Sequence, residues 1–198
     1  MGLWIFATSV ILLALPLLAQ PDELLQRLRP EGYVTDQASV FSQVEHNALE
    51  SLLGELEKRT TAQVAVVALQ SLEGNEIRDF ANQIFEQWGI GQKDKDNGVL
   101  ILTAIQDRKI WIEVGYGIEP IIPDSRVGRI LDERIIPLFR QGNLASGLMA
   151  AAAEIASIIA ADAGVQLTGT ATTHRRSITG RPQFSIIHIL ILLVVVIL

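Results

Sequence analysis

The spacing of apolar side chains along this chain predicts several helices. Apolar residues recur at helical spacing over residues 42–59 and again over residues 76–88. The first of these segments opens with Ser42-Gln-Val-Glu45, a capping box in which the serine and glutamate satisfy amides at a helix start. A last, alanine-rich helix is expected to follow Gly142-Asn143 and to end near Asp162.

Shorter apolar runs between these helices predict strands. Residues 62–69 and 99–105 are almost continuously apolar, which is typical of strands covered on both faces. Residues 109–114 alternate more clearly, with Trp111 and Glu113 on one side, and predict a strand with a more exposed face. The connection between the last two strands is short, so we expect them to form an antiparallel hairpin.

One further helix completes the expected fold. Pro123-Asp124 predicts a helix that runs to about Phe139, with Asp124 as its N-cap and with Pro137 bending or ending it. Helices and strands then alternate along the chain. This order predicts an α/β fold, a layered sandwich in which a small mixed β-sheet carries helices on both faces.

Both ends of the chain are apolar and predict contact with a membrane. Residues 1–19 have the length and the leucine and alanine content of a signal peptide, with a cleavage site after Ala19, although an uncleaved N-terminal anchor fits the same run. Residues 184–198 are dominated by isoleucine, leucine and valine. A bilayer span needs about 20 apolar residues, so we expect this run to be the start of a truncated transmembrane helix.

Polar linkers are expected to separate these ends from one globular domain. Residues 20–30 and 164–183 are predicted linkers, which leaves residues 31–163 as the domain. Export by the N-terminal run would place this domain outside the cytoplasm, on the periplasmic side. Three arginines in the second linker oppose this orientation, because positive charge normally favours the cytoplasmic side; outside, they would pair with phosphates of the lipid bilayer.

Charge and cysteine content narrow the classes of function. The chain has no cysteine, which excludes a thiol nucleophile, a zinc-thiolate cluster and a disulfide scaffold. Residues 30–163 contain 20 acidic and 11 basic side chains, so the domain is more acidic than the whole chain, whose net charge is −6. Such a domain would repel nucleic acid, because phosphate binding needs clustered cations. Small cations are the expected ligands.

The candidate site is a loop at residues 91–98 that contains Asp94 and Asp96. Aspartate, asparagine and glycine are also ordinary turn residues, so the loop taken alone favours a simple turn. Asp36, Glu113 and Asp124 also lie at the ends of expected elements, where side chains can converge on one edge of a sheet. Clustered carboxylates suit hard cations, so these five residues predict a calcium or magnesium site.

The segment Gly115-Tyr116-Gly117 has two interpretations. The glycines allow an irregular strand exit, and Tyr116 either covers the edge of the core or forms a wall of the predicted site. Trp88 and Trp111 fall in largely apolar segments and are expected to pack in the core. The three histidines have no ligand partner at metal spacing, and none is expected to be catalytic.

The order of motifs in residues 88–117 resembles the TPM domain family. This stretch contains Trp-Gly-Ile-Gly, then Lys-Asp-Lys-Asp-Asn-Gly before a buried strand, and then Glu-Val-Gly-Tyr-Gly. Similarity extends over the domain from Tyr33 to about Asp162. The resemblance implies a bacterial membrane-anchored protein with one span after the domain. It also implies acid-phosphatase activity in some members and auxiliary work at membrane complexes in others.

Two functions of different classes follow from these observations. The first is an extracytoplasmic, membrane-tethered binding module that assists assembly, repair or modulation of a membrane protein complex and binds calcium. The alternative is a metal-dependent acid phosphatase. Against the enzyme, the chain lacks a P-loop and the other common phosphate-binding motifs, and only Lys93 and Lys95 lie near the candidate loop. We therefore expect the binding module.

Overall fold

A four-stranded mixed sheet lies at the centre of the computed structural model, which describes residues 23–168. The strands are β1 (Val34–Asp36), β2 (Gln63–Leu69), β3 (Gly98–Ala104) and β4 (Lys109–Val114), arranged in sequence order across the sheet. The first three run parallel, and β4 pairs antiparallel with β3. The predicted hairpin is therefore confirmed.

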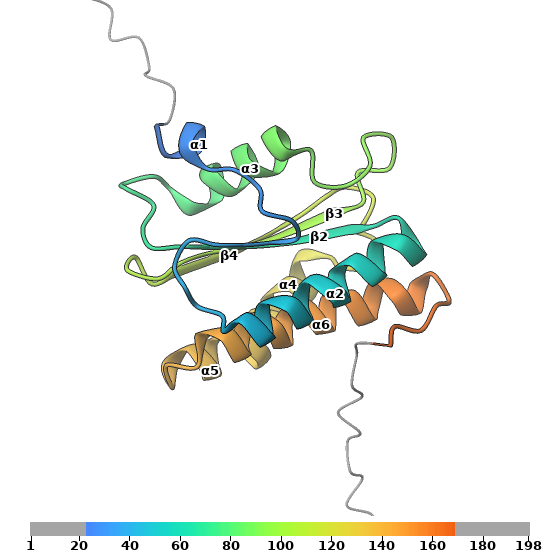
Figure 1. The fold of residues 1–198 in the computed structure, drawn as a ribbon. Coiled ribbons are helices and arrows are strands. Elements are labelled where there is room, and N and C mark those ends of the chain that lie inside the picture. The colour runs from blue at the N-terminus through green and yellow to red at the C-terminus, as the bar shows by residue number, and fades with distance from the viewer. Residues whose placement is uncertain (1–22, 169–198) are drawn as a thin grey trace, which may run out of the picture.

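Helices cover both faces of this sheet (Figure 1). One face carries α2 (Gln43–Thr60) and α6 (Leu144–Asp162), with α4 (Asp124–Ile130), the π-helical turn η1 (Leu131–Ile135) and α5 (Ile136–Arg140) beside them. The other face carries α3 (Ile77–Trp88) and α1 (Glu23–Arg27). The predicted α/β layered sandwich is confirmed.

The central strand β3 divides its side chains between two cores. Val99 and Ile101 pack with the layer of α2 and α6, whereas Leu100 and Leu102 pack with α3. All seven residues of β3 are buried. This burial on both faces explains why the segment is continuously apolar and shows no alternation in the sequence.

The segment predicted as an N-terminal linker contains a helix that belongs to the folded domain. Leu24 and Leu28 are buried in the core beneath α3, and Arg27 forms an ion pair with Glu73 at 2.8 Å. The three-residue strand β1 was also not predicted as a strand. Both elements are too short to produce a hydrophobic period, so only their packing reveals them.

The helix expected over residues 123–139 differs in two respects. Pro123, in an extended conformation, occupies the cap position without a side-chain hydrogen bond, so Asp124 is the first helical residue and not the N-cap. The helix also widens at η1, where the Ile136 amide donates to the carbonyl of Leu131, five residues back. The wider turn precedes Pro137, which has no amide proton for an ordinary helical bond.

One helix in the described part of the chain, α6, is long and apolar enough to cross a membrane. Its length and composition alone are weak support for membrane anchoring. Leu148, Ala152 and Ile155 of this helix are fully buried in the core shared with α2 and the sheet, which accounts for its apolar character. The predicted signal or anchor (1–19) and the predicted span (184–198) lie outside the described residues.

Truncation of the central strand tests this assignment of the core. Ile101 is completely buried in β3, so Ile101→Ala should lower the free energy of unfolding by about 2–5 kcal/mol, measured by denaturant unfolding. Val44, which is 79% exposed on α2, is the matched control, and Val44→Ala should change stability by less than about 0.5 kcal/mol. Equal stability of the two variants would contradict the placement of β3.

Candidate functional site

The sheet has two ends that matter for the predicted metal site. At the amino edge β2 and β3 begin and β4 ends; at the carboxyl edge β1, β2 and β3 end. Asp94 and Asp96 precede β3 and lie at the amino edge, whereas Asp36 ends β1 at the carboxyl edge. A seven-residue strand spans about 20 Å, so Asp36 cannot share a cation with the other two.

The carboxylate of Asp36 has a structural role at the carboxyl edge. Its two oxygens accept hydrogen bonds from the amides of Val40 at 3.0 Å and Phe41 at 2.8 Å. These bonds close the turn between β1 and α2. Both oxygens of Asp36, one of the five predicted ligands, are therefore occupied by neighbouring backbone amides.

The remaining candidates also fail to converge. Glu113 lies in β4 on the side of α3, where it accepts a hydrogen bond from the Trp111 indole at 2.7 Å. Asp124 begins α4 in the layer on the other face of the sheet, and its side chain is exposed. Within residues 23–168, no group of three or more histidine, cysteine, aspartate or glutamate side chains is placed to hold a metal ion. The prediction that the five carboxylates form one cluster is wrong.

The structure instead joins two loops at the amino edge. The amide of Gly115 donates to the Gly98 carbonyl at 2.9 Å, and the amide of Gly117 donates to the Asp96 carbonyl at 3.1 Å. A Cβ atom on Gly117 would lie 1.9 Å from the Lys95 carbonyl oxygen. These two loops therefore approach so closely that only glycine fits, which explains the Gly-Tyr-Gly sequence.

A buried amide network supports the first of these loops. The Asn97 side chain is 8% exposed; its oxygen accepts from the Gln92 amide at 2.7 Å, and its nitrogen donates to the Thr61 hydroxyl at 3.3 Å. The Gln63 side chain accepts from the Gly91 amide at 2.7 Å. The loop is thus fixed to β2 and to the end of α2 by hydrogen bonds.

The same network continues to a tyrosine with a perturbed pKa. Gln63 donates to the Glu57 carboxylate at 2.6 Å, and the other oxygen of Glu57 accepts a short hydrogen bond from the Tyr33 hydroxyl. This hydrogen bond, together with burial and the negative charges of Glu57 and Glu50, raises the pKa of Tyr33 to about 12. Protonated Tyr33 is therefore part of the folded state.

Tyr116 lies on the outer side of the two joined loops, and its side chain points to solvent. Its side chain is 77% exposed, so it does not cover the edge of the core. Lys93, Asp94, Lys95 and Asp96, which are all exposed, belong to the partner loop. We call these five residues the amino-edge rim.

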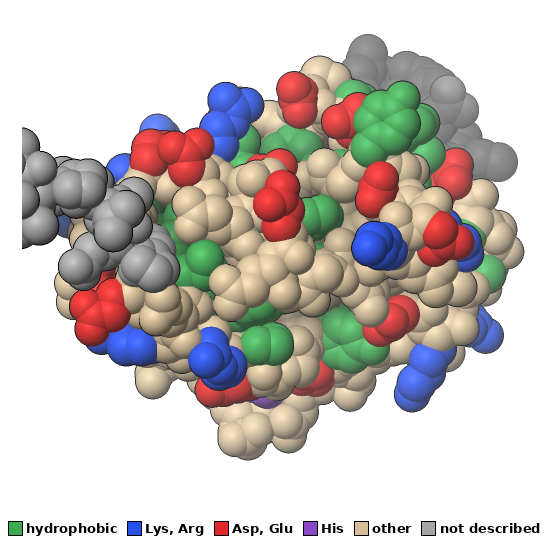
Figure 2. Space-filling view, turned by 90° about the horizontal axis from the view of Figure 1, so that it is seen from above, with side chains coloured by type: hydrophobic (Ala, Val, Ile, Leu, Met, Phe, Trp, Pro, Cys, Tyr) green, Lys and Arg blue, Asp and Glu red, His purple; other side chains and the backbone are tan. Residues whose placement is uncertain are grey.

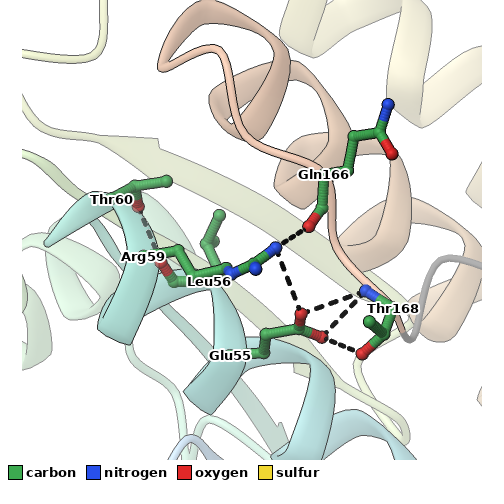
Figure 3. Close-up of polar contacts among 6 residues, drawn as sticks. All are labelled: Glu55, Leu56, Arg59, Thr60, Gln166 and Thr168. Carbon is green, nitrogen blue, oxygen red and sulfur yellow. Dashed lines mark hydrogen bonds and ion pairs between the residues drawn. The ribbon is translucent and has the colours of Figure 1, made fainter.

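The chain leaves the described domain beside the end of α2 that leads to the amino edge (Figure 3). Arg59 donates to the Gln166 carbonyl, and the Glu55 carboxylate accepts from the amide of Thr168 at 3.0 Å and from its hydroxyl at 2.7 Å. These bonds fix the last described residue against α2. Thr61, which follows α2, also accepts a hydrogen bond from Lys95 of the rim at 3.1 Å.

Charge does not gather on the face covered by α1 and α3. Figure 2 shows acidic and basic side chains interspersed there with small apolar areas. A field of one sign would be needed to bind a polyanion. This face of the described domain therefore lacks the concentrated charge that a polyanion would need.

Sequence reasoning missed a cationic pocket at the carboxyl edge. Arg108 comes from the β3–β4 turn, Lys109 is the first residue of β4, and Arg140 comes from the end of α5. Each looks like an ordinary surface residue in its own segment. Because the segments are distant in the sequence, no local spacing could have indicated the pocket.

Comparison with known proteins agrees with the fold. The sequence profile of the TPM domain matches residues 34–158. The solution structure of the N-terminal domain of a P. gingivalis protein is 30% identical, with a TM-score of 0.63 over 67% of this chain and 85% of that one. Curated proteins gave no match.

Two further solved structures show the same fold at lower identity. BA42 from Bizionia argentinensis is 23% identical, with a TM-score of 0.54 over 64% of this chain and 86% of that one. The N-terminal domain of cg2496 from Corynebacterium glutamicum is 18% identical, with a TM-score of 0.52 over 65% of this chain and 82% of that one.

A glycine substitution tests the close contact of the two loops. In Gly117→Ala the added methyl group would overlap the Lys95 carbonyl, so the free energy of unfolding should fall by about 1–3 kcal/mol or more. Gly128 in α4 has no atom within 4 Å of its Cβ position, and Gly128→Ala should be neutral or stabilise by up to about 1 kcal/mol. Denaturant unfolding of both variants measures the contrast, and equal effects would contradict it.

The raised pKa of Tyr33 predicts a loss of stability at alkaline pH. The phenol ionises near 10.0 in the unfolded chain and near 12 in the folded one, so its contribution is full below pH 10.0 and disappears as pH rises to about 12. The difference in phenolate absorbance between the parent and Tyr33→Phe isolates this group from Tyr116. A difference transition centred at the ordinary pKa would show that the bond to Glu57 does not hold the proton.

Proposed function

Because the chain belongs to the TPM domain family, we propose that it is an extracytoplasmic binding module tethered to the membrane, which assists assembly, repair or modulation of a membrane protein complex. One observation carries this proposal. Tyr116 is exposed on two loops that are joined through glycine contacts, so a large aromatic side chain is presented to solvent on a rigid base.

Tyr116 has the properties of an anchor residue at a protein interface. Tyrosine is enriched among the residues that contribute most to binding, because it has a large apolar surface and a hydroxyl at its tip. A side chain that serves only the fold would be expected to bury most of this surface. Because the loops beneath it are fixed before binding, little conformational entropy is lost when a partner covers them.

The charges around Tyr116 suit a polar border of such an interface. Two lysines and two aspartates alternate in sequence along the loop next to it, and all four are exposed. Exposed charges contribute little affinity, but their pattern selects a complementary partner surface and favours one orientation. The amino-edge rim therefore combines an apolar anchor with charges that define specificity.

The exit of the chain supports a tether on the same side. Thr168 is bound to the end of α2, and this helix leads through Thr61 to the loop of the rim. A membrane segment that follows the expected linker at residues 164–183 would hold the domain close to the bilayer. The rim would then meet the parts of a membrane complex that project from the lipid.

Calcium or magnesium is an additional ligand that we propose for the rim. Asp94 and Asp96 are the two predicted ligands that share one loop, and both are exposed. Calcium takes about six to eight oxygen ligands, so water, backbone carbonyls or the partner would supply the others. In this arrangement the cation would join the module to its partner and would not complete a site within the domain.

The metal-dependent acid phosphatase remains the alternative, and the geometry favours it less. Such an enzyme holds its metal with several protein ligands beside the phosphate group. Asp36, Glu113 and Asp124 lie in three different elements, and among the described residues they form no metal-holding group with the aspartates of the rim. Asp94, Asp96, Lys93 and Lys95 lie on an exposed surface.

Affinity purification of the full chain from its own membranes tests the proposed function. Tyr116→Ala should reduce recovery of the co-purifying membrane complex at least about tenfold, because loss of an interface anchor costs about 2 kcal/mol or more. Val44→Ala is the control, since it removes the other highly exposed apolar side chain from α2. Equal recovery with Tyr116→Ala and with the parent would contradict the proposal.

The same purification distinguishes the contribution of the cation from that of Tyr116. A chelator and Asp96→Asn should each reduce recovery; asparagine suits the left-handed backbone of this position, where φ is 46°. If neither has an effect, the cation is not involved and the Tyr116 result stands alone. Turnover of a phosphate ester by the parent that Asp96→Asn abolishes would support the phosphatase.

A further inference from the structure

A cavity of about 910 Å³ opens at the carboxyl edge, away from the amino-edge rim. It lies between the turn that joins β3 to β4, the start of α3, and the corner between α5 and α6. Its volume falls in the range typical of small-molecule sites, about 300–1,000 Å³. In open α/β sheets, ligands commonly bind beyond the carboxyl ends of the strands, which is where this cavity lies.

The interior of the cavity is largely apolar. Its walls come from both cores of the domain and from the α5–α6 corner, and they include Ile77, Ile105, Ile110, Ile136, Phe139 and Leu144. Ile77 is buried. The other five side chains are partly exposed, although they line a largely apolar wall of the cavity. A hydrocarbon chain placed here would remove this apolar area from water, which is the main source of affinity in such sites.

Three cations surround the mouth of the cavity, and no acidic side chain lines it. Within residues 23–168, Arg108 and Arg140 form no ion pair. Lys109 lies in the field of Glu76 and Asp107, whose negative charges offset part of the positive charge of the three cations. The lining of the cavity still carries an excess of positive charge, because Arg108 and Arg140 form no ion pair with a described residue.

The position of Arg108 adds to this observation. Its φ of 53° lies in the left-handed region, where glycine or asparagine would be favoured in a hairpin turn. An arginine here is held at the mouth of the cavity at a conformational cost. The turn geometry alone gives no reason for a long cationic side chain at this position.

We propose that this cavity binds a single-chain anionic amphiphile, with its carboxylate or phosphate head at Arg108 and Arg140 and its hydrocarbon chain against the isoleucines and Phe139. Arginine is suited to either head group, since its planar donors match both. Neither half of such a ligand is sufficient alone. A small hydrophilic anion would leave the apolar wall in water, and an uncharged lipid would leave the arginines without a partner.

This site is distinct from the proposed function of the rim. The two lie at opposite ends of a seven-residue strand, about 20 Å apart. The pocket requires neither a partner complex nor a divalent cation. Failure of one proposal therefore leaves the other intact.

Calorimetric titration of the full chain in a non-ionic detergent tests the proposal, with titrations into detergent alone subtracted. The probes are octanoate and octyl phosphate, compared with octanol, acetate and inorganic phosphate. Octanoate and octyl phosphate should bind saturably and at least about tenfold more tightly than the other three. Across butanoate, hexanoate and octanoate, affinity should rise about threefold or more for each methylene added.

Paired variants test the cations. Arg108→Gln combined with Arg140→Gln should weaken binding of octanoate and octyl phosphate at least about tenfold, because two charged hydrogen-bond donors are lost. Lys58→Gln combined with Arg129→Gln removes the same charge from exposed positions outside the cavity and should leave affinity within about twofold of the parent. Melting midpoints of both double variants show whether each is folded.

Four results would overturn the proposal. Acetate or inorganic phosphate binding as tightly as the amphiphiles would identify a simple anion site. Octanol binding as tightly as octanoate would show that the arginines do not take part. Absence of saturable binding by the folded parent, or an equal loss in both double variants, would show that the cavity is not a site for this class of ligand.

Discussion

The parallel pairing of β2 with β3 is the constraint on which the rest of this domain depends. Parallel strands need a crossover, and α3 provides it on one face while α2 and α6 cover the other. Both strands are consequently buried on two sides, and all polar loops must lie at the two ends of the sheet. This requirement creates an amino edge and a carboxyl edge with separate chemistry.

The antiparallel strand β4 gives the amino edge its particular form. Because β4 runs back along β3, it returns Gly115 and Gly117 to the loop that precedes β3. Carbonyl oxygens of Lys95 and Asp96 occupy the space in which side chains would otherwise stand. Tyr116 lies between the two glycines. Because no room is left for its side chain inside the domain, the side chain is directed to solvent. Its exposure is thus a consequence of backbone packing and not of a loose loop.

Buried and partly buried polar side chains make this edge rigid. Asn97, Gln63 and Glu57 each satisfy groups from a different segment, so the loop, β2 and α2 are joined by partly buried hydrogen bonds. Loss of one partner would leave a buried amide unsatisfied, which costs more than the bond contributes. A rigid amino edge and an open, cationic cavity at the carboxyl edge give one small domain two surfaces with different capacities for binding.

Several features were determined by the sequence alone. The periodic segments fixed α2, α3, α6 and the strands β2, β3 and β4 to within about two residues, because long apolar runs admit few ways to be buried. The motif in residues 88–117 indicated the family because its glycines and acids stand at unusual spacings. Backbone packing requires these spacings. The position of the loop at residues 91–98, directly before a buried strand, was also readable from the sequence.

Only the tertiary structure decided how the loops and caps are grouped. Asp36 and Asp96 look equivalent in the sequence, since both lie next to a strand, yet one follows its strand and the other precedes it, which separates them by the length of the sheet. Arg108 and Arg140 are distant in the sequence, yet they line one cavity because β4 and α5 meet at the same corner. Hydrophobic periodicity reports which face of an element is buried; the direction of each strand and the meeting of distant turns arise from the packing of the whole chain.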